Sequence, residues 1–418
     1  MVPAPRRARG SSPLTFARMS SSPTSPPSTP SASVGGLLVV SIDRLPAWML
    51  SSYGATWVST PAFDGLAAAG ITFDRLLATD VDPRATLADL MGRGLLWRAA
   101  AAAGRPAVIV TDDRALPERP PGVDIVEVPT VPASTPAADD EGTNIARLCA
   151  QARDIVSAGG HGLVWCHAGS LGVAWDAPLA YRAAYVDPED PPPPAGAGVP
   201  HFAVTADTDP DAVMGCRQAF AGQLTLLDRC VGGVVAAARG LPRPWAVAVV
   251  GLRGMPLGLH GQVGCGPDGN GAARPYGEWA HLPAIIAAAD GRMAGQRDGG
   301  LATPADVGAT LVDLVAAGAA PAPDGRSLAG LFADWSRVPR DRVLVSAADS
   351  AAIVTRAWHL VAERLPDGTR SARLFAKPDD YFELSDVADR CPGVAEELAA
   401  ALEPGREAAP LSPAALGG

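Results

Sequence analysis

The sequence predicts an α/β protein with a large, mostly parallel sheet flanked by helices, followed by a small C-terminal antiparallel α+β subdomain. Two observations support this prediction. From residue 36 to residue 335, short apolar runs alternate with helical segments, which is the rhythm of parallel strands joined by crossover helices. From Arg342 onward, short strands joined by turns follow one another and a helix closes the series, which is typical of an antiparallel meander.

The first strand is expected at Leu37–Ile42, an apolar and β-branched run. Asp43 follows at its carboxyl end, where open α/β sheets place their ligands. We expect further strands at 71–76, 106–110, 123–128, 162–166, 244–250, 282–289, 343–347, 352–355, 358–364 and 373–376. We expect helices at 63–69, 96–103, 144–158, 211–239, 303–317 and 394–402, with another that starts in the acidic loop 80–84 and runs through residue 90.

The chain divides by composition into four segments. Residues 1–35 are rich in Ser, Pro and Arg and are expected to be disordered. Residues 36–335 form the α/β domain, and residues 336–404 form the C-terminal subdomain. Residues 405–418 are expected to form a flexible tail.

Composition limits the classes of partner. A net charge of −10 argues against nucleic acid or an anionic membrane as the main partner. No apolar run approaches the roughly 20 residues that a membrane crossing needs. The first residues lack the continuous apolar stretch of a secretory signal, so we expect a cytoplasmic protein. The six cysteines show no paired metal-ligand spacing and are expected to be free thiols.

The sequence contains Tyr53-Gly54, then Thr60-Pro61 and Asp64. This pattern resembles the sulfatase family, within the alkaline-phosphatase superfamily, which carries the same residues in the matching places. Later stretches also resemble family motifs, and they occur in the same order. They are VWCHAGSLGVAWDAP, AFAGQLTLLDRCVGGVV, AVVGLRGMPLGLHG, HLPAIIAAADG, TPADVGATLVDLVAAG, APDGRSLAGLF and FAKPDDYFELSDVADRCP. The resemblance covers residues 37–392 and implies the sulfatase fold.

The resemblance also implies a particular active site, from which this sequence departs. The family uses a hard cation held by oxygen ligands, typically Ca²⁺, and a nucleophile that is a Ser or a Cys oxidised to formylglycine. Of the acidic pair after the first strand, only Asp43 is retained as a metal ligand, because Arg44 stands at the second position. Asp80 stands at the nucleophile position, whereas the Arg of that loop is retained as Arg84.

Two further family elements are altered, and one is kept. The Asp-His/Asn pair becomes Leu252-Arg253, and the His of the Pro-His-x-Pro element becomes Gly172. His260 keeps the His of the family's Gly-x-His-Gly stretch. Because leucine cannot coordinate a cation and arginine adds fixed positive charge, we expect an empty metal site and no cofactor. Ca²⁺ is expected only if the site is functional.

The charged residues allow a structural interpretation and a functional one. In the first, Asp43 pairs with Arg44, Arg84 or Arg253, so that guanidinium groups substitute for the lost cation. In the second, the same three arginines bind an anion.

The other polar residues also allow both a structural and a functional interpretation. Asp80 and Asp82 are expected either to cap a helix in an exposed acidic loop or to belong to a rebuilt catalytic site. His260 is either a hydrogen-bonded loop residue or a catalytic acid.

We therefore expect a non-catalytic sulfatase-family protein, related to sulfuric ester hydrolases, that binds a small anionic ligand or a protein partner. The alternative is an active sulfate or phosphate ester hydrolase with a rebuilt site. In that alternative, Asp80 is the nucleophile or a metal ligand, Arg84 and Arg253 hold the anion, and His260 is the acid.

Overall fold

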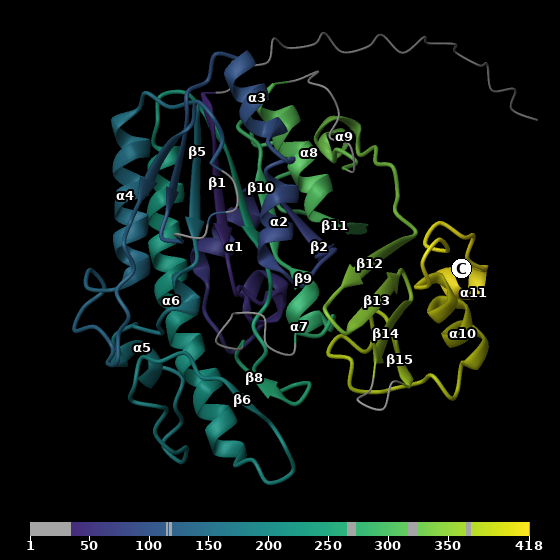
Figure 1. The fold of residues 1–418 in the computed structure, drawn as a ribbon. Helices are drawn as coiled ribbons and strands as arrows, with labels where there is room; N and C mark the ends of the chain where they lie inside the picture. Colours follow the sequence, from purple (N-terminus) through teal and green to yellow (C-terminus); the bar gives the residue numbers. More distant parts are fainter. Residues whose placement is uncertain are drawn as a thin grey trace, which may run out of the picture. The chain divides into compact units, whose positions relative to one another are not determined.

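The central feature is a mostly parallel sheet, seen in a computed structural model that describes residues 35–113, 116, 119–265, 273–316, 325–364 and 369–417 (Figure 1). In these ranges the strand order is β11-β2-β10-β7-β1-β5-β3-β4, with β9 paired to β2. The strands are β1 Gly36–Ile42, β2 Ile71–Leu77, β3 Ala107–Thr111, β4 Asp124–Glu127, β5 Leu163–Ala168, β7 Trp245–Gly251, β9 His281–Leu282, β10 Ala284–Ala287 and β11 Gln296–Ala302. Among the described strands of this sheet, β9 and β10 alone pair antiparallel with their neighbours.

Strand β1 lies in the middle of this sheet and is buried along its whole length. It runs parallel to β5 on one side and to β7 on the other, with Val40 opposite Cys166 and Val249. A strand that is covered on both faces needs an unbroken apolar run, which is what its sequence provides. The carboxyl ends of these three strands therefore converge, and Asp43 follows β1 at this point.

Helices cover both faces of the sheet. Figure 1 shows α4 and α6 on one side of the strands and α3 and α8 on the other. Helix α4 packs on α6, while α2 and α3 pack on α8. The helices and remaining short elements are η1 Ala47–Met49, η2 Ser51–Tyr53, α1 Pro61–Ala69, α2 Pro83–Leu90, α3 Leu95–Ala102, α4 Asn144–Ala158, η3 Ser170–Gly172, α5 Leu179–Ala183, β6 Phe202–Ala203, α6 Pro210–Arg239, β8 Gln262–Val263, α7 Gly277–Ala280, α8 Pro304–Val315 and α9 Ala329–Asp334. The α/β architecture predicted from the sequence is confirmed.

Two parts of the sheet differ from the expectation. The strand expected over 282–289 is divided into β9 and β10 by Pro283, which has no backbone N–H to donate to a ladder. Strand β11 was not expected, because Gln296–Ala302 is polar and contains two glycines. It pairs only with β2 at the edge of the sheet, where such a composition is tolerated.

The C-terminal region forms the expected antiparallel meander. Its strands are β12 Arg342–Ser346, β13 Ser350–Thr355, β14 Trp358–Arg364 and β15 Arg370–Ala376. They pair in chain order, and helix α10 at Pro392–Ala401 packs against β13, β14 and β15. The loop before α2 joins the two sheets, because Val81 donates its backbone N–H to the carbonyl of Ser346.

The last described residues differ from the expected flexible tail. Pro413–Leu416 form a short helix, α11, and Ala415 is fully buried. Thr355 donates its hydroxyl to the carbonyl of Ala415, and Trp358 donates its indole N–H to the carbonyl of Ala414. The composition of residues 405–418 suggested flexibility, but these two contacts hold the segment against the small sheet. The expected disordered segment 1–35 lies outside the described residues apart from Gly35.

Within the described ranges, no helix combines the length and the apolar character that crossing a bilayer requires.

A matched pair of substitutions tests the docking of α11. Ala415→Asp places a carboxylate at a fully buried position, whereas Ala414→Asp places it at an exposed one. We expect Ala415→Asp to lower the free energy of unfolding by about 2 kcal/mol, because a buried polar group without a partner loses its hydration. Urea unfolding and limited proteolysis of the C-terminus measure this. Equal effects of the two substitutions would show that α11 is not docked.

Candidate functional site

The carboxylate of Asp43 is held by two guanidinium groups at the carboxyl end of β1. Arg253 donates from Nε to Oδ1 at 2.8 Å and from Nη2 to Oδ2 at 3.1 Å, and Arg44 donates from Nη1 to Oδ2. All three residues are buried, with 7%, 9% and 3% exposure for Asp43, Arg44 and Arg253. Burial by itself raises the pKa of Asp43, but the two guanidinium groups outweigh it and hold that pKa below its ordinary value.

Gly172 makes room for the guanidinium of Arg44. Built onto the Gly172 backbone, a Cβ would overlap Nη1 and Cζ of Arg44. Arg44 itself lies in the left-handed backbone region, with φ 61°, which is uncommon for a residue with a side chain. Arg44 and Gly172, two of the positions where the sequence departs from the family pattern, are therefore in direct steric contact.

The side chains around Asp43 do not fit a hard divalent cation. Leu252, the residue before Arg253, is buried and apolar, and the nearby Cys265 offers a thiol rather than an oxygen. Both oxygens of Asp43 already accept hydrogen bonds from arginine. Among the described residues, no group of three or more His, Cys, Asp or Glu side chains could hold a metal ion.

The acidic loop is used to start helix α2. Asp80 accepts a hydrogen bond from the backbone N–H of Asp82 at 2.8 Å, and Asp82 accepts one from the N–H of Arg84 at 2.9 Å as the N-cap of α2. The Arg84 side chain is exposed. Asp82 lies close enough to Arg253 to interact with its charge. The structure thus brings Arg44, Arg253 and Asp43 together, while Arg84 is at the surface.

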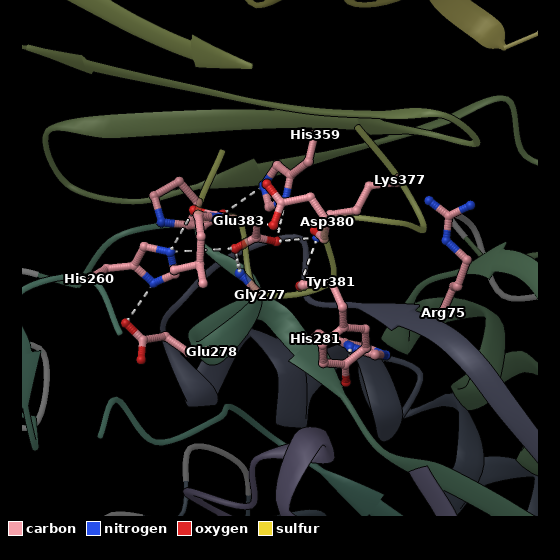
Figure 2. A network of polar contacts seen from close by, with 12 residues as sticks. Arg75, His260, Gly277, Glu278, His281, His359, Lys377, Asp380, Tyr381 and Glu383 are labelled. Atoms are coloured by element: carbon pink, nitrogen blue, oxygen red, sulfur yellow. Dashed lines mark hydrogen bonds and ion pairs between the residues drawn. The ribbon is translucent and has the colours of Figure 1, made fainter. Parts of the chain in front are cut away.

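His260 belongs to a second polar cluster. Its Nδ1 lies 2.9 Å from Oε1 of Glu278, and its Nε2 lies 3.3 Å from the carbonyl oxygen of Glu383 (Figure 2). The imidazole stacks on the ring of Tyr276, with 3.9 Å between centroids. His260 is thus held by contacts with three other residues of the protein.

Glu383 is the centre of this second cluster and was not expected from the sequence motifs. Its Oε1 lies 2.8 Å from Nδ1 of His359 and 2.8 Å from Nζ of Lys377, and its Oε2 accepts a hydrogen bond from the N–H of Gly277 at 2.7 Å (Figure 2). His359 and Lys377 belong to the small sheet region, whereas Gly277 starts α7 beside the large sheet. Burial acts to raise the pKa of Glu383, but His359 and Lys377 together lower it well below its ordinary value. Glu383 therefore joins the two sheet regions electrostatically.

Little in the sequence marks Glu383. It lies in the stretch FAKPDDYFELSDVADRCP, whose resemblance to a family motif gives this glutamate no particular role. Its partners His359 and Gly277 are distant in sequence, so no local spacing reveals the cluster.

A cavity of about 610 Å³ lies beside this cluster. Residues from both sheet regions line it, so it is a junction between them, and we call it the junction pocket. Its walls carry carboxylates, aromatic rings and cationic side chains. The carboxylates are those of Asp74, Glu278 and Glu383. The rings and cations include Trp48, Tyr53, Arg75, Arg297, Arg356, Lys377, Tyr381 and Phe382. Of the residues expected from the sequence to form the site, His260 lines it.

Replacing Glu383 by Gln tests its role at the junction. We expect the free energy of unfolding at pH 7 to fall by about 3 kcal/mol, because His359 and Lys377 lose their buried counter-charge. Since the folded-state pKa of Glu383 is lowered, its contribution is complete above the unfolded value of about 4.5 and is lost as pH falls below it. The difference in the free energy of unfolding between wild type and variant should therefore shrink as the pH falls below about 4.5.

Urea unfolding across this pH range measures the difference, with the exposed Glu396→Gln as the matched control. A difference that stays constant from pH 7 to pH 3 would argue against an ionised Glu383 at the junction.

A double-mutant cycle tests the contact between Arg44 and Gly172. We expect Gly172→Ala to destabilise the wild type by about 2 kcal/mol, because the added methyl group overlaps a buried guanidinium. The same change should cost much less in an Arg44→Ala background. Thermal and urea unfolding of the four proteins give the coupling energy. Equal costs in both backgrounds would contradict the steric relation.

Comparison with known proteins links the chain to a fold. No family model matches the sequence, and no curated protein matches it. The phosphonate monoester hydrolase of Agrobacterium radiobacter superposes with a TM-score of 0.66 at 17% identity, over 88% of this chain and 94% of that one. A 2-O GAG sulfatase gives 0.67 at 16% identity, over 88% and 91%.

A third structure is a complex with its substrate D-glucosamine-2-N,6-O-disulfate. It gives a TM-score of 0.68 at 13% identity, over 90% of this chain and 98% of that one. Such low identities establish the architecture and leave chemistry open. The protein therefore has the fold seen in sulfatases and phosphonate monoester hydrolases, as the motif resemblance implied.

Proposed function

We propose that this protein is a non-catalytic member of the sulfatase family and that it binds an anionic ligand. The observation that carries the first part is the buried ion pair between Asp43 and Arg253, joined by Arg44. A guanidinium that donates two parallel hydrogen bonds neutralises a carboxylate without any ion. The interaction that a divalent cation would supply is thus made by the chain itself.

The alternative is a hydrolase with a rebuilt site, and the geometry favours it less. Asp80 accepts a backbone hydrogen bond within its own loop, and Arg84 is exposed. Arg253 is engaged with Asp43, and His260 with Glu278. A nucleophile needs a neighbouring base or a cation that activates it. Each of these four residues instead makes its own structural contact or lies at the surface, and they do not form one catalytic site.

The binding part of the proposal is supported by the junction pocket rather than by Arg44 and Arg253. Those two arginines are buried and already donate hydrogen bonds to Asp43, so a ligand has little access to them. The junction pocket has cationic side chains in its wall and a volume in the range typical of small-molecule sites. It is therefore the better place for an anion.

Metal analysis combined with an ester-substrate screen tests the catalytic part. We expect protein incubated with Ca²⁺, Mg²⁺ or Mn²⁺ and then desalted to retain no stoichiometric metal. We also expect EDTA to leave its melting temperature unchanged. We expect no turnover of 4-nitrophenyl sulfate or 4-nitrophenyl phosphate beyond the buffer rate, because no activated nucleophile faces a substrate site.

The variant Asp80→Ala gives the decisive control. If wild-type protein turns over either ester and Asp80→Ala does not, the protein is a hydrolase and the proposal is wrong. If turnover persists in Asp80→Ala, the activity comes from a contaminant or from a site other than the one considered.

A further inference from the structure

The junction pocket is lined by a connected set of aromatic rings. Trp48 and Phe382 contact edge to face, with 6.0 Å between centroids, and Phe382 contacts Tyr381 in the same way at 5.0 Å. His281 lies between Tyr381 and Tyr53, at 5.6 Å and 6.1 Å. Burial lowers the pKa of His281 to about 4, so its ring is uncharged at neutral pH. These rings give the pocket flat, apolar surfaces on which another ring can pack.

Two of the cations in the pocket wall have carboxylate partners. Lys377 lies 2.8 Å from Glu383, as described above, and its ammonium is 5.9 Å from the centroid of the Tyr381 ring. Arg297 pairs with Asp74, and its guanidinium is 5.8 Å from the centroid of the Tyr53 ring. Their charges are therefore compensated within the protein.

The other two cations are Arg75 and Arg356. Arg75 donates from Nη1 to the carbonyl of Arg356 at 2.9 Å and from Nη2 to the carbonyl of Thr355 at 2.6 Å. These acceptors are neutral, and Figure 2 shows Arg75 to one side of the hydrogen-bonded network around Glu383. The side chain of Arg356 is exposed at the pocket wall.

The two guanidinium groups repel each other. Partial burial lowers the pKa of Arg75 below its ordinary value, and the nearby charge of Arg356 lowers it further. Like charges held close together in a pocket wall are stabilised by an anion, and a guanidinium binds carboxylate, phosphate or sulfonate oxygens in a planar, two-pronged geometry.

We propose that the junction pocket binds a small organic anion that carries an aromatic ring. The anionic group lies at Arg75 and Arg356, and the ring packs on Tyr53, Tyr381 and Phe382. This inference rests on the binding part of the proposed function and names its site and ligand class. A cavity of about 610 Å³ accommodates such a molecule.

The position of the pocket gives the ligand a structural consequence. Arg75 lies on β2 of the large sheet, and Arg356 lies in the turn between β13 and β14 of the small sheet. An anion that contacts both cross-links the two sheet regions. Binding should therefore raise the melting temperature of the whole protein, because only the folded chain brings both guanidinium groups together.

Isothermal titration calorimetry with three probes tests the ligand class. The probes are 1-naphthyl phosphate, which has both features, 1-naphthol, which has only the ring, and inorganic phosphate, which has only the anion. We expect 1-naphthyl phosphate to bind more tightly than either of the others and to raise the melting temperature. If 1-naphthol binds as tightly as 1-naphthyl phosphate, the arginines do not contribute to binding. If inorganic phosphate binds as tightly as 1-naphthyl phosphate, the aromatic rings do not contribute. Either result overturns the proposal.

Substitutions locate the bound molecule. Arg356→Ala removes an exposed side chain and should weaken 1-naphthyl phosphate binding about tenfold, the loss expected for a charge-assisted hydrogen bond. Phe382→Ala should weaken it through the ring contact. Arg239→Ala, an exposed arginine at the end of α6, is the matched control and should leave affinity unchanged. Equal affinity of wild type and both pocket variants, with each variant folded by circular dichroism, would place the site elsewhere.

The same probe separates this inference from the proposed function. Hydrolysis of 1-naphthyl phosphate releases fluorescent 1-naphthol. If wild-type protein releases 1-naphthol and Asp80→Ala does not, the non-catalytic proposal is contradicted. The effect of Arg356→Ala on the affinity for 1-naphthyl phosphate would still show whether the ligand binds in the junction pocket. Absence of binding by all three probes would contradict the pocket and leave the metal and turnover results as they stand.

Discussion

A single buried carboxylate, that of Asp43, determines which side chains can surround the end of the central strand. Asp43 follows the central strand of a parallel sheet, where three strand ends converge and solvent is excluded. An ionised carboxylate in such a place requires a positive partner, because desolvation without one costs several kcal/mol. A divalent cation is one solution, and it demands further oxygen ligands. A pair of arginines is another, and it demands space for two large planar groups.

The second solution explains why several departures from the family pattern occur together. Once Arg44 occupies the position of an acidic ligand, its guanidinium needs the volume beside residue 172, and only glycine leaves that volume free. Because Arg253 donates hydrogen bonds to both oxygens of Asp43, position 252 does not need a charged side chain, and the buried Leu252 can be apolar. The changes form one complementary arrangement rather than independent losses.

The sequence predicted the fold well where one element determines its own structure. Helix α4 has the predicted bounds, because an apolar stripe and a Thr143 N-cap define it locally. The prediction failed for elements whose structure depends on contacts with another segment. These are the polar edge strand β11 and helix α11, whose burial depends on hydrogen bonds from Thr355 and Trp358. At the candidate site, ion pairing of Asp43 was among the expectations. The cluster around Glu383 was not expected, because its partners His260, Gly277 and His359 come from distant parts of the sequence.

Burial and charge compensation together distinguish the two polar centres of the molecule. Around Asp43, two guanidinium groups donate to one carboxylate in a buried space, which favours a permanent structural role. Around the junction pocket, Glu383 and Asp74 neutralise Lys377 and Arg297, but the guanidinium pair of Arg75 and Arg356 has backbone oxygens and solvent for neighbours. Residual positive charge beside aromatic walls, at a place where two sheet regions meet, is the arrangement in which a ligand gains most from binding. The binding site proposed for this protein is therefore at the junction and not at the carboxyl ends of the central strands.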